Sequence, residues 1–172
     1  MKTHSRLNNL LGALAVHLND SIRDSTAKAA GHDASAPAAL VQIGSFTGES
    51  LAQLQAALGT TQSATTRVVQ RLRDAGLVRT PINAQDGRGV AVQLREAGCA
   101  ARADILTARE HVLNNALSVL SDDDAAQLLV LLEKMLLHLV PNRAVADVTC
   151  RLCDVAACPQ DSCPAEPSNR VA

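Results

Sequence analysis

The chain has 172 residues, 47% of them hydrophobic, so it is long enough to bury a core and extensive disorder is not expected. Aromatic residues make up only 1%, a single Phe46, which favours packed helices of Leu, Val, Ile and Ala over a sheet sandwich. The formal net charge of -1 does not by itself indicate a class of binding partner. A helix needs about 20 consecutive apolar residues to span a bilayer, and no segment of the sequence approaches that length.

The first predicted element is a long amphipathic helix. Its leucines recur at helical spacing from Leu7 to Ile22, and the helix is expected to end near Ala30-Gly31. The stretch from His32 to Pro37 is small and polar, typical of a linker. A short apolar helix closed by Gly44 is then predicted over residues 38–43.

Two further helices are predicted around a tight glycine turn. The first contains Leu51 and Leu58 and ends at Gly59, where a left-handed C-cap residue is needed. Thr61 is expected to cap the second, which runs to about Ala75. Its inner face is apolar, and its other face carries side chains that hydrogen-bond to base edges and phosphates. These candidate DNA-binding residues are Gln62, Ser63, Thr66, Arg67 and Arg71.

A period-two pattern replaces the helical one after Leu77. Strands are predicted over residues 78–80 and 90–94, joined by a long loop with Pro81 and two glycines. Residues 62–95 contain six arginines and two aspartates, so this region is locally basic although the chain is not. The order of elements predicts a mainly α fold with a small β-hairpin wing, a winged helix-turn-helix.

Helical spacing returns after Gly98 and continues to Leu120. Ser121 followed by three aspartates then predicts a strong helix start, and Pro141 ends that helix. Its leucines cover more than one face, and a monomer of this size would struggle to bury them all. We therefore expect a second copy of the chain to cover them in a homodimer.

Four cysteines crowd the C-terminal tail in the spacing C-x2-C-x4-C-x4-C. They are Cys150, Cys153, Cys158 and Cys163. Four soft ligands within fourteen residues can close around one metal centre, either zinc or an iron-sulfur cluster, and spacing alone leaves both open. Structural disulfides or four unligated thiols are the alternatives, although disulfides are not expected in a reducing cytoplasm. Cys99 stands apart and is expected to be buried.

The stretch LAQLQAALGTTQSATTRVVQRLRDAGLVR, from Leu51 to Arg79, resembles the DNA-reading core of the MarR family. DGR at residues 86–88, followed by VAVQLREAG, resembles that family's wing signature. The resemblance covers about residues 5–140. It implies that Arg88 enters a minor groove while Asp86 helps hold it, and that the flanking helices form a dimer. Thr65 departs from the usual aliphatic residue, and the lack of aromatics weakens the expectation of an aromatic acid as effector.

The expected organisation has four parts. They are an N-terminal dimerisation helix over residues 1–30, a winged helix-turn-helix over 36–98, C-terminal dimerisation helices over 99–140 and a cysteine-rich tail over 141–172. We expect a cytoplasmic, non-enzymatic repressor that binds a pseudo-palindromic operator in double-stranded DNA, controlled by the metal centre or a small-molecule effector. The alternative is a thiol-disulfide redox protein that uses Cys150 and Cys153 as its redox pair, or a metal-handling protein, on a winged-helix scaffold.

Overall fold

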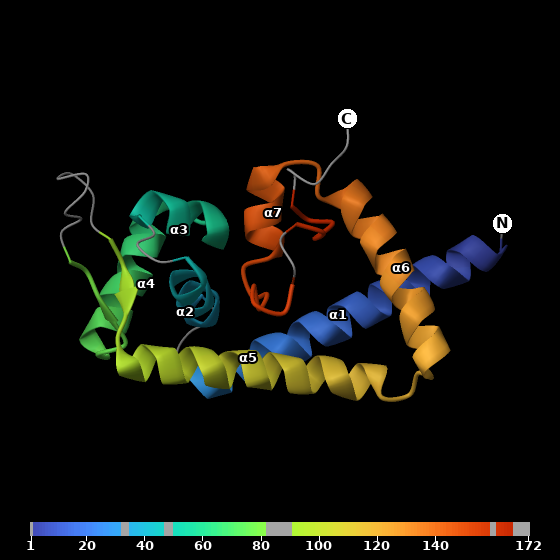
Figure 1. Ribbon diagram of the computed structural model, residues 1–172, viewed down its shortest axis with the longest axis horizontal. Helices are drawn as coiled ribbons and strands as arrows, with labels where there is room; N and C mark the ends of the chain where they lie inside the picture. Colours follow the sequence, from blue (N-terminus) through green and yellow to red (C-terminus); the bar gives the residue numbers. More distant parts are fainter. Residues whose placement is uncertain (1, 32–34, 47–49, 82–90, 159–160, 167–172) are drawn as a thin grey trace.

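The computed structural model describes residues 2–31, 35–46, 50–81, 91–158 and 161–166. Two long helices, α1 (Lys2–Ala30) and α5 (Glu96–Leu117), run side by side along the molecule (Figure 1). The remaining elements are α2 (Ala36–Ser45), α3 (Leu51–Leu58), α4 (Gln62–Asp74), β1 (Val78–Arg79), β2 (Gln93–Leu94), α6 (Asp122–Leu139) and α7 (Arg143–Thr149). Helices α3 and α4 and the hairpin gather at one end, and α6 lies toward the other (Figure 1).

Helix α2 is the centre of the main core. Residues 36–43 are all buried, as expected for a helix that is hydrophobic on every side. The prediction that Gly44 closes this helix is wrong, because the helix continues through it to Ser45. Gly44 is instead a close-approach position: a Cβ atom there would lie 2.3 Å from Cδ of Arg102 on α5.

The β-hairpin is shorter than the sequence predicts. Val78 pairs with Leu94, and Arg79 with Gln93, in an antiparallel arrangement. Ala91 leaves this ladder and forms an isolated bridge with Ser50, the residue that caps α3. The hairpin is thereby tied to the start of the helix-turn-helix. The wing residues 82–90 lie outside the described residues.

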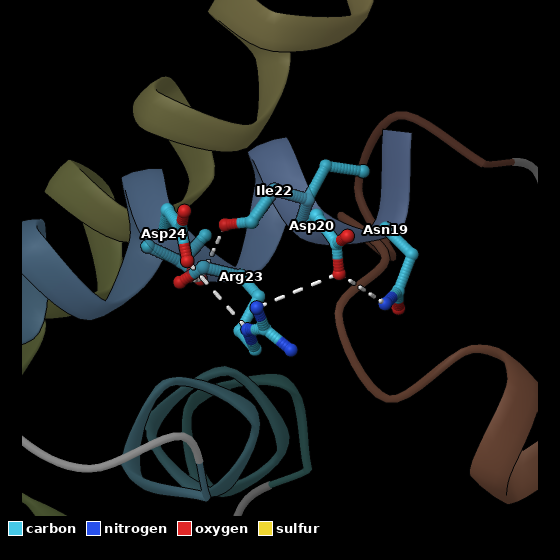
Figure 2. A network of polar contacts seen from close by, with 6 residues as sticks. Asn19, Asp20, Ile22, Arg23 and Asp24 are labelled. Atoms are coloured by element: carbon cyan, nitrogen blue, oxygen red, sulfur yellow. Dashed lines mark hydrogen bonds and ion pairs between the residues drawn. The ribbon is translucent and has the colours of Figure 1, made fainter. Parts of the chain in front are cut away.

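The apolar surfaces of α1 and α6 have no cover within the described part of the chain. Helix α6 contains no buried residue, and five of its leucines are between 44% and 60% exposed. On α1 the same holds for the N-terminal leucines, whereas the C-terminal half carries polar contacts (Figure 2), with Arg23 lying 3.5 Å from Asp20 and 3.6 Å from Asp24. The exposed leucines of α1 and α6 are Leu7, Leu10, Leu11, Leu14, Leu129, Leu131, Leu132, Leu137 and Leu139. Large exposed apolar surfaces mark interaction sites.

The tail contains a helix that the sequence did not predict. Helix α7 starts after Asn142, whose side-chain oxygen accepts a hydrogen bond from the backbone N–H of Val145 at 3.1 Å. Asparagine is a favoured N-cap residue, so its position directly after Pro141 was an available signal. The expectation that Cys99 is buried is also wrong, because it lies exposed on α5. None of the described helices is long and apolar enough to cross a bilayer.

Gly98 is expected to be intolerant of alanine although it lies in a helix. A Cβ atom there would be 2.1 Å from the backbone oxygen of Leu77, which cannot move without shifting the hairpin. Gly98→Ala should therefore lower the free energy of unfolding by about 1–3 kcal/mol despite alanine's better helix propensity. Denaturant titration measures this. Ala100→Gly, at an exposed position of the same helix, measures the effect of helix propensity alone, which is expected to be about 1 kcal/mol of unfolding free energy.

Candidate nucleic-acid interface and cysteine cavity

Helix α4 divides cleanly into a buried and an exposed face. Thr61 caps it as predicted, its hydroxyl accepting from the backbone N–H of Ala64 at 3.3 Å. The inner face consists of Thr65, Val68, Val69 and Leu72, each 5% exposed or less. The hydroxyl of Thr65 donates to the Thr61 carbonyl at 3.1 Å, which satisfies its polar group within the core.

The five predicted DNA-binding residues of α4 all lie exposed. They are Gln62, Ser63, Thr66, Arg67 and Arg71. The Arg67 side chain donates through Nε to the Ser63 carbonyl at 3.3 Å, and Thr66 donates to the Gln62 carbonyl at 2.9 Å. Both bonds join residues four positions apart on α4, so each side chain lies along the exposed surface of its own helix. Asp86 and Arg88, the other two predicted residues, lie outside the described residues.

The turn before α4 depends on Gly59. This residue is the C-cap of α3 with φ +61, in the left-handed region that the sequence predicted. A Cβ atom there would also lie 3.2 Å from Cγ2 of Val148 on α7. The turn of the helix-turn-helix therefore packs directly against the helix that precedes the cysteines.

The four tail cysteines line one small cavity of about 60 Å³. Cys150 caps α7, and a tight turn in which Cys153 N–H donates to the Cys150 carbonyl at 2.8 Å brings these two together. The Sγ atoms of Cys158 and Cys163 lie 3.5 Å apart. Among the described residues, no three His, Cys, Asp or Glu side chains are arranged as a group that could hold a metal ion. The cavity thus brings the predicted ligands together without forming a complete coordination shell.

The two neighbouring thiols of Cys150 and Cys153 differ in acidity. The hydrogen bond from Cys150 and the nearby Arg109 cation lower the pKa of Cys153, against the opposing effect of burial. The same hydrogen bond and burial raise the pKa of Cys150. Burial, and next the hydrogen bond with Cys163, raise the pKa of Cys158 to about 11. Cys153 is the thiol of this pair that ionises first.

An ion-pair network that the sequence did not predict lines the cysteine cavity. Arg143 at the start of α7 contacts Asp147 at 2.8 Å and Glu166 of the tail at 2.7 Å. The spacing of four between Arg143 and Asp147 on one helix was the available signal. Val140, Ala146 and Ala165 form a small second core beside the cavity, with Cys150 and Cys163 packed against it. The tail is thus held on both sides of the cysteines.

The tail also contacts the main core. Leu152, between the first two cysteines, packs against the core cluster around α2. Arg102 of α5 lies 4.0 Å from Asp154 and donates to Ser45 at 3.3 Å on α2. These contacts join the cysteine segment to the elements that position α3 and α4.

The comparisons with known proteins agree with this architecture. Residues 33–89 match the model of the MarR family. A probable transcriptional regulator from Pseudomonas aeruginosa is 27% identical, with a TM-score of 0.57 over 75% of this chain and 98% of its own. Wild-type MarR from E. coli is 25% identical, with a TM-score of 0.60 over 73% and 96%.

A third solved structure supports the fold alone. The YusO protein of Bacillus subtilis is 19% identical, with a TM-score of 0.68 over 78% of this chain and 94% of its own. No curated protein sequence matches the chain. The predicted mainly α, winged helix-turn-helix fold is therefore confirmed.

Proposed function

We propose that this chain, a member of the MarR family of winged-helix proteins, is a cytoplasmic repressor that binds a pseudo-palindromic operator in duplex DNA. The observation that carries the proposal is the exposed polar face of α4, which is backed by four buried side chains on the opposite face. A recognition helix needs this division, because one face holds the scaffold while the other reads base edges in the major groove. We assign the chain no catalytic role.

The DNA contacts divide into two groups. Gln62, Ser63, Thr66, Arg67 and Arg71 form the major-groove surface of α4, with the arginines as donors to guanine or phosphate. Arg88 at the wing tip enters the adjacent minor groove, and Asp86 orients it. Arginine suits the narrow minor groove because the negative potential is enhanced there.

Arg67→Ala and Arg88→Ala are each expected to weaken operator binding by about 1–3 kcal/mol. Fluorescence anisotropy with labelled operator, at one near-physiological salt concentration, measures the loss against a scrambled duplex. Arg23→Ala is the matched control, because Arg23 pairs with Asp20 and Asp24 on the surface of α1, far along the chain from the reading surface. Unchanged affinity in both reading variants would count against the proposed interface.

The operator-binding form is proposed to be a homodimer. The exposed leucines of α1 and α6 support this, because they are too many to remain in water and are carried by the helices that flank the winged helix. A two-fold symmetric pair would bury the same patch on both copies and present two α4 helices to successive major grooves. The pseudo-palindrome follows from that symmetry.

We further propose that the four tail cysteines hold a metal centre that controls operator affinity. All four line one cavity, and the ion pairs of Arg143 with Asp147 and Glu166 join α7 to the tail beside it. Thiolates select zinc or an iron-sulfur cluster. The contacts of Val148 with Gly59 and of Leu152 with the core would transmit loss of the centre to the helix-turn-helix.

Metal analysis and visible absorption of anaerobically purified protein test this centre. A brown protein with stoichiometric iron identifies a cluster, and a colourless protein with one zinc per chain identifies zinc. Protein without metal whose cysteines are oxidised in pairs would instead favour the thiol-disulfide alternative, for which the 3.5 Å separation of Cys158 and Cys163 is the supporting observation.

A further inference from the structure

The four tail thiols form two pairs rather than one group of four. Cys150 donates a hydrogen bond to the sulfur of Cys153, and the Sγ atoms of Cys158 and Cys163 lie 3.5 Å apart. All four cysteines line the same cavity. Yet within the described part of the chain, no three side chains of the His, Cys, Asp or Glu type form a group that could hold one metal ion. Each pair is therefore compact, but no third sulfur joins either of them.

The separation of two ligand sulfurs depends on whether they share a metal atom. Metal–sulfur bonds of about 2.3 Å at a tetrahedral atom place two thiolates on that atom about 3.8 Å apart. A single zinc ion would hold all four sulfurs at about this separation, so any three of them would form one close group. In a four-iron, four-sulfide cluster each cysteine binds its own iron, and no two cysteine sulfurs come so close.

A cluster of two irons and two sulfides gives a third pattern. Each iron takes two cysteine sulfurs, which lie close together, while the bridging sulfides keep the two pairs apart. The tail cysteines have this pattern. The 3.5 Å between Cys158 and Cys163 is within a few tenths of an ångström of the separation expected on one shared metal atom, and Cys150 and Cys153 are in hydrogen-bond contact. Two metal atoms fit these thiols better than one or four.

Local structure holds each pair in place. Cys150 is the C-cap of α7, and a turn in which the Cys153 N–H donates to the Cys150 carbonyl at 2.8 Å fixes the first pair. In the second pair, the Cys163 carbonyl accepts from the N–H of Glu166 at 3.0 Å. One cysteine of each pair, Cys150 and Cys163, packs against the small second core beside the cavity. Gathering all four sulfurs around one ion would move a pair relative to that core, which costs packing contacts.

We propose that the tail holds a two-iron, two-sulfide cluster, in which Cys150 and Cys153 bind one iron and Cys158 and Cys163 bind the other. This assignment rests on the proposed function, because it names the composition of the metal centre proposed there. Each of the four thiols would give up its proton on binding, and two sulfide ions would bridge the irons. Each iron then has four sulfur ligands. Because the sulfides are shared, neither iron is held without the other.

Iron, zinc and acid-labile sulfide are measured on the full-length protein purified without oxygen. We expect two irons and two sulfides per chain, and no zinc. After reduction with dithionite, which adds one electron to the cluster, we expect an electron paramagnetic resonance signal that persists at liquid-nitrogen temperature. The signal of a reduced four-iron cluster relaxes faster and is broadened away at that temperature.

Cys163→Ala tests the pairing, because it removes one ligand of the second iron and leaves the first pair intact. Since the sulfides are shared, iron and sulfide should fall together by at least tenfold. Cys99→Ala is the matched control, at an exposed position of α5 that does not line the cavity, and it should retain both. Circular dichroism should show the helix content of the wild type in both variants.

The outcomes separate this assignment from the proposed function. One zinc ion per chain, or four irons with four sulfides, would overturn the two-iron cluster and leave the proposed metal centre standing. Iron without sulfide, or full iron retention in Cys163→Ala, would also overturn it. Protein that holds no metal, both as purified and after anaerobic incubation with ferrous iron and sulfide, would contradict the cluster and the proposed metal centre together.

Discussion

A chain carrying Leu14→Asp and Leu132→Asp is expected to be monomeric and to bind operator DNA at least about 100-fold more weakly than the wild type. Leu14 is 50% exposed on α1 and Leu132 is 44% exposed on α6, so neither substitution disturbs the core of the described fold. In a two-fold interface each change occurs twice, and each places a carboxylate in an apolar contact where it has no partner. At about 1.5–3 kcal/mol for each leucine removed from burial, dimerisation would weaken by about 6 kcal/mol or more.

Sedimentation velocity measures the mass, and anisotropy with labelled operator measures the affinity. Ala52→Asp, an equivalent change at an exposed position of α3, should leave the protein dimeric. Circular dichroism should show unchanged helix content in both proteins. A double variant that remains a dimer would refute the assignment of α1 and α6 as the pairing surface.

The second large effect is expected from Cys153→Ser. A thiolate centre of the zinc-finger kind contributes about 10–16 kcal/mol from four ligands, so loss of one should lower metal affinity by about 100-fold or more. Serine has nearly the same shape as cysteine, and the change therefore acts on ligation rather than on packing. Operator affinity should fall by about tenfold, because α7 packs on Gly59 at the turn of the helix-turn-helix.

Inductively coupled plasma mass spectrometry gives the metal content per chain, and operator titration at one salt concentration gives the affinity. Cys99→Ser is the matched control, since Cys99 lies exposed on α5 and does not line the cysteine cavity. The control should retain the full metal content and normal operator affinity. A Cys153→Ser protein with a full metal complement would exclude Cys153 as a ligand.

The tail is in direct contact with the helix-turn-helix and with the core that supports it. Val148 lies against Gly59, Leu152 packs on the core around α2, and Asp154 faces Arg102.

Local features of the sequence predicted helix α4 well. The hydroxyl cap of Thr61, the left-handed Gly59 and the buried positions Val68 and Leu72 are all confirmed. Ser121 is confirmed as the cap of α6, where it forms a capping box with Asp124 and, through its hydrogen bonds, lowers the pKa of that carboxyl. Each of these depends on residues within about four positions of one another, which is the range over which a helix end is decided.

The sequence by itself therefore determined the order of the helices as far as α6, the capped helix α4 with its exposed polar face, and the presence of four cysteines in the tail. The tertiary structure alone decided that Gly98 meets the carbonyl of Leu77 and that α7 rests on Gly59. The physical reason is separation along the chain. Capping and periodicity act between near neighbours, whereas close approach, burial and cavities arise from residues that only packing brings together.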